Sequence, residues 1–156
     1  LSGKLDGIWS GRKIVCRCAK LKAKDEIRTW LEHLVLNAFA PEGYPKESAL
    51  IMKDTAVTYS PVDNAAEILG AFLVRYWEGL MMPLRFFPAT SLEFAATDGN
   101  MDKALKKFES GFKYTGEEED PYFRLCFGQE DDPLAADFGR IARELLTPML
   151  AHRSKD

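Results

Sequence analysis

The sequence lacks the features of membrane-spanning and disulfide-stapled proteins. No apolar run approaches the roughly 18 residues that a membrane-spanning helix needs, so we expect no contact with a membrane. Only three cysteines are present, and Cys16 and Cys18 are too close along one predicted strand to pair comfortably. This cysteine usage is typical of a reducing compartment and excludes a disulfide framework. We therefore expect a cytoplasmic protein.

Metal-ligating residues are also scarce. The chain has two histidines, and its third cysteine, Cys126, is far from the others in sequence. Two thiols separated by one residue are a poor basis for tetrahedral zinc, and burial as small apolar side chains explains Cys16 and Cys18 better. Acidic runs at 117–120 and 130–132 resemble cation ligands, but consecutive like charges are typical of a solvated loop. We expect no metal site and no cofactor.

The composition is that of an ordinary globular domain. With 46% hydrophobic and 29% charged residues, the 156 residues suit a single domain that spans 1–156. The sequence opens on Leu1, inside a strand-like run and without an initiator methionine. We therefore expect a fragment of a longer polypeptide.

Positive charge is concentrated at the start of the chain. Residues 1–28 carry eight Lys and Arg against three Asp and Glu, although the whole chain has a net charge of −3. A basic segment on an acidic body can contact phosphate. The same lysines could instead protect an exposed strand edge from pairing with another chain, and the sequence favours neither explanation. The candidate DNA-binding residues are Arg12, Lys13, Lys20, Lys22 and Lys24.

Hydrophobic periodicity predicts the first half of the fold. Apolar residues at helical spacing predict a core helix over residues 25–40, which Pro41 ends. Two strand-like runs, 2–9 and 12–19, meet at a Ser-Gly turn before this helix and predict a hairpin. A second hairpin is predicted over residues 49–59.

Helices dominate the prediction for the second half. A capped start at Ser60 predicts a helix to about Met82, whose apolar stripe places Tyr76 and Trp77 in the core. Shorter helices are predicted over residues 91–96 and 102–112, and a last helix follows Asp132-Pro133. The sequence therefore predicts an α+β fold, a small sheet of two hairpins packed with about four to five helices.

The first predicted hairpin and helix have the layout of a PD-(D/E)XK nuclease core. In that core an Asp on one strand and an acid-x-Lys on the next hold Mg²⁺, which activates water for phosphodiester cleavage. Asp6 fits the first position, but the second strand offers Cys16 and Cys18. Pairing Cys18 with Lys20 restores the lysine and still leaves no carboxylate, and thiols suit Mg²⁺ poorly. Glu32 on the helix could supply a displaced carboxylate.

Four short motifs carry a resemblance to a known family. They are WLEHLV at 30–35, YWEGLMMPL at 76–84, DPYFRL at 120–125 and LLTPML at 145–150. Together they resemble the C-terminal domain of RecC, the gamma subunit of the RecBCD helicase–nuclease (exodeoxyribonuclease V). The resemblance implies a degenerate PD-(D/E)XK nuclease-like fold without catalysis, in a subunit that scaffolds RecB-like and RecD-like partners and handles DNA through the complex. Gln-x-x-x-Tyr, which RecB-type nucleases carry on the helix, is missing between Ile27 and Leu36.

Three hypotheses follow. The first is a non-catalytic module for DNA repair, with Asp6, Cys16 and Cys18 as degenerate positions. The second is an active Mg²⁺-dependent nuclease with a displaced carboxylate. The third is a protein-interaction domain whose basic segment never meets DNA.

Overall fold

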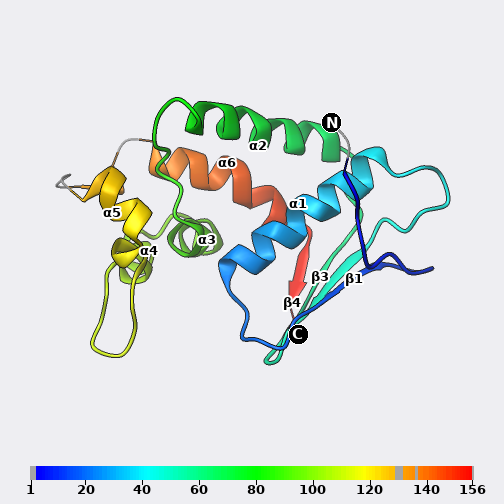
Figure 1. Cartoon of the computed structure of the whole chain (residues 1–156), viewed down its shortest axis with the longest axis horizontal. Coiled ribbons are helices and arrows are strands. Elements are labelled where there is room, and N and C mark those ends of the chain that lie inside the picture. The colour runs from blue at the N-terminus through cyan, green and yellow to red at the C-terminus, as the bar shows by residue number, and fades with distance from the viewer. Residues whose placement is uncertain (1–2, 129–131, 136, 156) are drawn as a thin grey trace. The chain divides into compact units, whose positions relative to one another are not determined.

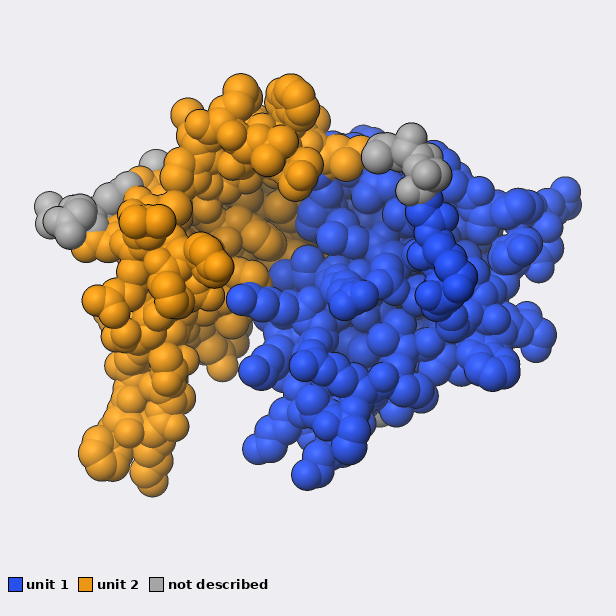
Figure 2. Space-filling model, viewed as in Figure 1, with its two compact units in different colours: residues 1–72, 151–156 blue, residues 73–150 orange. Residues whose placement is uncertain are grey.

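A computed structural model describes residues 3–128, 132–135 and 137–155. It divides into two compact units, which Figure 2 shows in different colours: unit 1 is residues 1–72 with 151–156, and unit 2 is residues 73–150. The described residues form four strands and six α-helices, so the predicted α+β class is confirmed with one or two more helices than expected. That the whole chain is one domain stays a prediction.

Unit 1 contains a four-stranded mixed sheet and the first helix (Figure 1). Its elements are β1 (Lys13–Cys16), α1 (Ala23–Phe39), β2 (Ser48–Ile51), β3 (Ala56–Tyr59) and β4 (Arg153–Lys155). The strands lie in the order β1-β2-β3-β4. β1 pairs parallel with β2 across the α1 crossover, and the other two pairings are antiparallel. The predicted second hairpin is therefore confirmed as β2 and β3.

The predicted first hairpin is wrong. Residues 3–9 form no strand and meet β1 through a single antiparallel bridge, between Ile8 and Lys13. Gly7 turns this segment with φ +74°, and a Cβ there would lie 2.4 Å from the Ile14 carbonyl oxygen, so the turn requires glycine. β1 ends at Cys16, which leaves Cys18 outside the strand.

α1 confirms the predicted core helix to within two residues at each end. It packs against β2 and β3, and the core of the unit holds Trp30, Leu34, Leu50, Val57 and Tyr59. Its buried face also includes three polar residues, Glu26, Thr29 and His33. Part of the predicted apolar stripe, including Ile27, Leu31 and Val35, is therefore only partly buried, and polar side chains are buried beside it.

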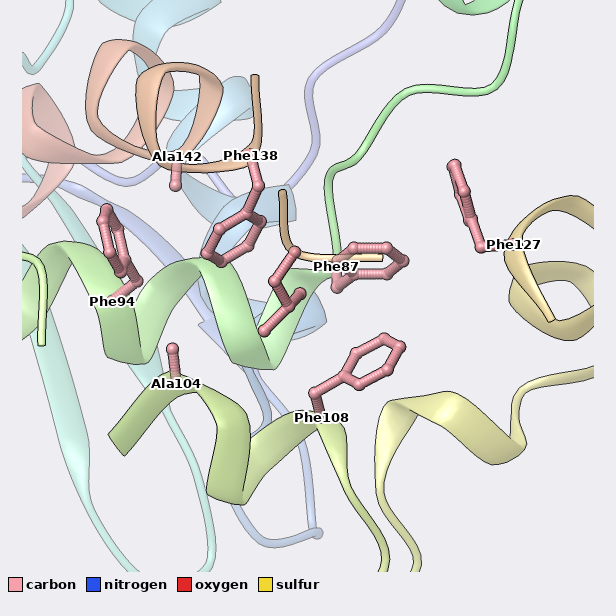
Figure 3. Close-up of a cluster of buried hydrophobic side chains, with 8 residues drawn as sticks. Phe87, Phe94, Ala104, Phe108, Phe127, Phe138 and Ala142 are labelled. Atoms are coloured by element: carbon pink, nitrogen blue, oxygen red, sulfur yellow. The ribbon is translucent and has the colours of Figure 1, made fainter. Parts of the chain in front are cut away.

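Unit 2 contains α3, α4 and α5. It also contains the second half of α2 and all of α6 except its last residue. These helices are α2 (Ala65–Gly79), α3 (Pro88–Ala96), α4 (Met101–Phe108), α5 (Pro121–Phe127) and α6 (Phe138–Ala151), with a 3₁₀ turn at Glu117–Glu119. Phe87 lies at the centre of an aromatic cluster in this unit (Figure 3), with ring centroids 4.9 Å from Phe108 and 5.4 Å from Phe127. None of the helices in the described part of the chain has the length and apolar character needed to cross a membrane.

Three predictions for this half need correction. α2 begins at Ala65 and not directly after Ser60, whose hydroxyl lies 3.1 Å from His152 Nδ1. The predicted buried stripe is exposed from residue 73 onwards, and Tyr76 and Trp77 are each 66% exposed. The acidic run 117–120 is only partly a solvated loop, since both Glu117 carboxylate oxygens accept hydrogen bonds from backbone N–H groups of α3. Two residues of the second acidic run, 130 and 131, lie outside the described residues.

Candidate functional site

A pocket in unit 1 brings several predicted site residues together. It encloses about 660 Å³ between the segment before β1, β1 itself and the first turns of α1. Asp6, Lys13, Cys16 and Glu32 all line it. We call it the unit 1 pocket. It does not include Cys18 or the three lysines that follow it, so the structure assembles only part of the predicted constellation.

Lys13 is the buried cation of the unit 1 pocket. Its side chain is 2% exposed, and Nζ lies 2.7 Å from Glu32 Oε2. The same ammonium donates a hydrogen bond to the Asp6 carbonyl oxygen over 3.2 Å. Because a buried ammonium group is tolerated only when it is paired, this contact holds Lys13 inside the protein. The charge of Lys13 is therefore directed inward, onto Glu32, and its contact with DNA stays a prediction.

Each carboxylate of the pocket faces a basic side chain. Asp6 Oδ1 lies 2.9 Å from Lys4 Nζ at the exposed rim, and this hydrogen bond raises the pKa of Lys4. Glu32 Oε1 lies 3.3 Å from Arg28 Nε, and Asp25 pairs with Arg17. Over the described ranges, no group of three or more His, Cys, Asp or Glu side chains is arranged to hold a metal ion. The donor set fits Mg²⁺ poorly, because each of the three carboxylates pairs with a Lys or Arg side chain.

The two cysteines are placed differently from their expected position. Cys16 lies at the end of β1 and lines the pocket, while Cys18 lies beyond the strand. Both side chains are exposed, which corrects the expectation that they are buried apolar residues. Because Cys18 lies beyond β1, the two thiols do not share one strand face.

The predicted DNA-binding residues other than Lys13 lie at the surface. Arg12 is about half-exposed and pairs with Glu47 over 3.3 Å. Lys20, Lys22 and Lys24 are exposed in and just after the loop between β1 and α1. Together they make a basic segment outside the pocket.

Sequence reasoning missed three cations that line the pocket, Lys4, Arg17 and Arg28. The pairing of Arg28 with Glu32 could have been found, because the two residues are four positions apart on one helix. Arg17 pairs with Asp25 across the loop, and sequence spacing carries no comparable signal for that contact.

His33 and Ser48 form a second buried polar contact in unit 1. His33 Nδ1 lies 2.9 Å from the Ser48 hydroxyl, and Nε2 lies 3.1 Å from the Ser60 carbonyl oxygen. The carbonyl can only accept, so Nε2 carries the proton and Nδ1 accepts from Ser48. Burial lowers the pKa of His33 to about 4, which keeps the ring neutral at neutral pH. Ser48 is 1% exposed, so this serine–histidine pair is closed to substrate and is structural.

Comparison with known proteins gives one finding. A family model described as the RecC C-terminal domain matches residues 1–99, which include the unit 1 pocket, the basic segment and the His33 network. No curated protein matches the chain.

Proposed function

Because the chain belongs to the RecC C-terminal domain family, we propose that it is a non-catalytic, nuclease-like module of a RecBCD-type complex. In this proposal it acts in the cytoplasm in the repair of DNA double-strand breaks. It contacts RecB-like and RecD-like subunits and handles DNA as part of the complex. The nuclease-like core keeps the position of an active site and has lost its chemistry.

The ion pair between Lys13 and Glu32 carries the non-catalytic part of the proposal. A nuclease of this class needs carboxylate oxygens that converge on a divalent cation. In the unit 1 pocket, the ammonium of Lys13 lies against Glu32 at 2.7 Å, with only 2% of its side chain exposed. A metal ion at this carboxylate would have to displace a buried lysine. The ammonium supplies positive charge there but cannot polarise a water molecule as a metal ion does.

The alternative of an active nuclease depends on Glu32 as the displaced carboxylate. Its two oxygens contact Lys13 and Arg28, one oxygen to each cation. Asp6 pairs with Lys4 at the rim, where both side chains are more than three-quarters exposed. These contacts favour the non-catalytic module, because both carboxylates are paired with basic side chains.

A cleavage assay tests this part of the proposal. We expect the chain, incubated with end-labelled DNA and either Mg²⁺ or Mn²⁺, to give no metal-dependent products. Lys13→Met releases Glu32 from its buried partner and is also expected to give none, since Glu32 keeps Arg28 and Asp6 keeps Lys4. Metal-dependent cleavage that Asp6→Ala abolishes would establish the active nuclease instead.

An exposed apolar surface supports the subunit-binding part of the proposal. The end of α2 and the residues after it leave seven large apolar side chains exposed, which we call the α2 surface: Leu73, Val74, Tyr76, Trp77, Leu80, Met81 and Met82. Aromatic residues and methionine are enriched at protein interfaces, and large exposed apolar patches mark docking sites. An apolar stripe at helical spacing that is left this exposed suits a partner subunit.

Copurification tests the α2 surface. In the parent polypeptide, Trp77→Ser is expected to reduce recovery of the RecB-like or RecD-like subunit. Tyr122→Ser is the matched control, because Tyr122 on α5 is an aromatic residue of similar exposure, 78%. Equal recovery of both partner subunits with Trp77→Ser and with the control would remove this surface from the proposal.

The basic segment supports DNA contact. Lys20, Lys22 and Lys24 are exposed, and with Arg12 they could neutralise several phosphates. Reversing the three lysines to glutamate is expected to weaken DNA binding and to lower its dependence on salt. The matched control reverses Lys103, Lys106 and Lys107, three exposed lysines of α4. Equal losses in the two triple variants would favour the third hypothesis, a domain that does not meet DNA through this segment.

A further inference from the structure

Unit 2 contains a second pocket, which the proposed function does not use. It encloses about 700 Å³ and is lined by residues of α4, of the 3₁₀ turn, of α5 and of the segment before α6. Its lining lies between residues 101 and 134, outside the part of the chain that matches the RecC family model. We call it the unit 2 pocket. Its volume falls within the range of small-ligand and peptide side-chain sites, roughly 300–1,000 Å³.

The floor of the unit 2 pocket is apolar and firmly packed. Phe108 and Phe127 line it and are only 7% and 6% exposed. Figure 3 shows them extending from α4 and α5 towards Phe87, which they contact edge to face. Leu105 also lines the pocket and is 37% exposed, so an apolar surface is open to a ligand. Such a floor favours an aromatic or aliphatic side chain.

The rim of the unit 2 pocket is acidic. Four carboxylates and one basic residue line the pocket: Glu109, Glu118, Glu119, Asp132 and Arg124. Arg124 Nη1 lies 3.3 Å from Glu119 Oε2, so its charge is matched by one of the four. Three negative charges remain, and they disfavour DNA or any other polyanion.

One carboxylate of the rim is held by the backbone. The Glu118 carboxylate accepts a hydrogen bond from the Ser110 N–H over 2.6 Å, which fixes its position. Across the residues that the structure describes, no three acidic, histidine or cysteine side chains gather closely enough to hold a metal ion. The rim therefore complements several separated positive charges better than one divalent cation.

We propose that the unit 2 pocket binds a short basic peptide segment of a partner protein. An apolar side chain of the segment packs on Leu105, Phe108 and Phe127. Lysine or arginine side chains on either side of that anchor face the acidic rim. The opposite charge of the peptide speeds the encounter and selects the partner, and burial of the apolar anchor holds the complex together.

Fluorescence anisotropy with three labelled hexapeptides tests the proposal on the 156-residue chain. KRFLKR has both features, EDFLED keeps the apolar centre with the opposite charge, and KRSSKR keeps the charge without the anchor. We expect KRFLKR to bind at least about tenfold more tightly than either control, and its affinity to fall as salt is added. Equal binding of EDFLED, or of KRSSKR, would overturn the proposal, as would the absence of binding by all three.

Three substitutions test whether the peptide binds in the unit 2 pocket. Glu109→Gln is expected to weaken KRFLKR by about twofold to fivefold, as one exposed charge pair does. Leu105→Asp is expected to weaken it about tenfold or more, because it places a charge on the apolar floor. Asp102→Asn is the matched control, because Asp102 is an exposed acid of α4 that does not line the pocket. If Asp102→Asn weakens the peptide as much as Glu109→Gln, the binding is nonspecific and the proposal fails.

Discussion

His33 should make the stability of unit 1 depend on pH. The ring is fully buried, stacks on Trp30 with centroids 5.4 Å apart, and lies between the Ser48 hydroxyl and the Ser60 carbonyl. Protonation would give the ring its second proton, on the Nδ1 atom that accepts from Ser48, in a buried site. Burial is the main cause of the lowered pKa, and the charge of His152 adds to it, while the hydrogen bond to Ser60 acts in the opposite direction.

The size of the effect follows from the two pKa values of His33. Its pKa falls from 6.5 to about 4 on folding, so between these values the unfolded chain binds a proton that the folded chain does not. The stabilisation is therefore complete above pH 6.5 and is lost as the pH falls. Linkage gives a loss of about 2 kcal/mol between pH 7 and pH 5, and of about 3 kcal/mol once the pH is below 4.

Urea denaturation at pH 7 and pH 5 measures this loss, with His33→Gln as the comparison. The glutamine side chain of this variant can donate to the Ser60 carbonyl and accept from Ser48 without titrating. Glu26 acts in the opposite direction, because burial raises its pKa, so folded Glu26 takes up a proton first as the pH falls. Both proteins share that contribution, and the difference between them isolates His33. If the His33→Gln variant loses as much stability between the two pH values as the unsubstituted chain, the reasoning is wrong.

Three further predictions concern stability, each measured by urea denaturation at pH 7. Lys13→Met should lower the free energy of unfolding by about 1–3 kcal/mol. The loss is smaller than for a fully buried ion pair, because Glu32 keeps Arg28 as a partner, and adding Glu32→Gln should recover part of it. Trp30→Ala should cost about 3–5 kcal/mol and Trp77→Ala less than about 1, since Trp30 is 0% and Trp77 66% exposed. Gly7→Ala should cost about 2 kcal/mol or more, because its φ of +74° and the nearby β1 carbonyl exclude a side chain. Equal losses for the two tryptophan variants would contradict the burial of one and the exposure of the other.

Elements with local signals were predictable from the sequence. Two short runs of apolar and β-branched residues, separated by a short polar turn, predict β2 and β3, and a long periodic run ended by Pro41 predicts α1. The first hairpin failed for a physical reason. β1 pairs with β2, which lies more than thirty residues later in the chain. The two strands are parallel and joined by a crossover, so no turn motif in the sequence indicates the pairing.

The buried polar residues of unit 1 show what periodicity cannot report. A hydrophobic pattern assigns Glu26 and His33 to the surface of α1, yet both are buried. Glu26 Oε2 lies 3.0 Å from Arg153 of β4, and His33 meets Ser48 of β2. Burial of a polar side chain depends on these distant partners, which the local pattern does not contain. The same limit applies to the candidate site. Sequence reasoning grouped Asp6 with Cys16, which line one pocket, but it did not predict that Lys13 pairs with Glu32 there.

The α2 surface separates two meanings of the same sequence signal. An apolar stripe at helical spacing shows that a face of the helix is suited to burial, and it does not say which chain covers that face. Up to residue 72 the stripe of α2 is partly covered by the protein itself, and from Leu73 onwards it is exposed. Covering these exposed aromatic rings and methionines with a partner would contribute about 25 cal/mol of binding free energy for each Å² of apolar surface buried. The free energy that sequence reasoning assigned to folding at Tyr76 and Trp77 is therefore available for assembly.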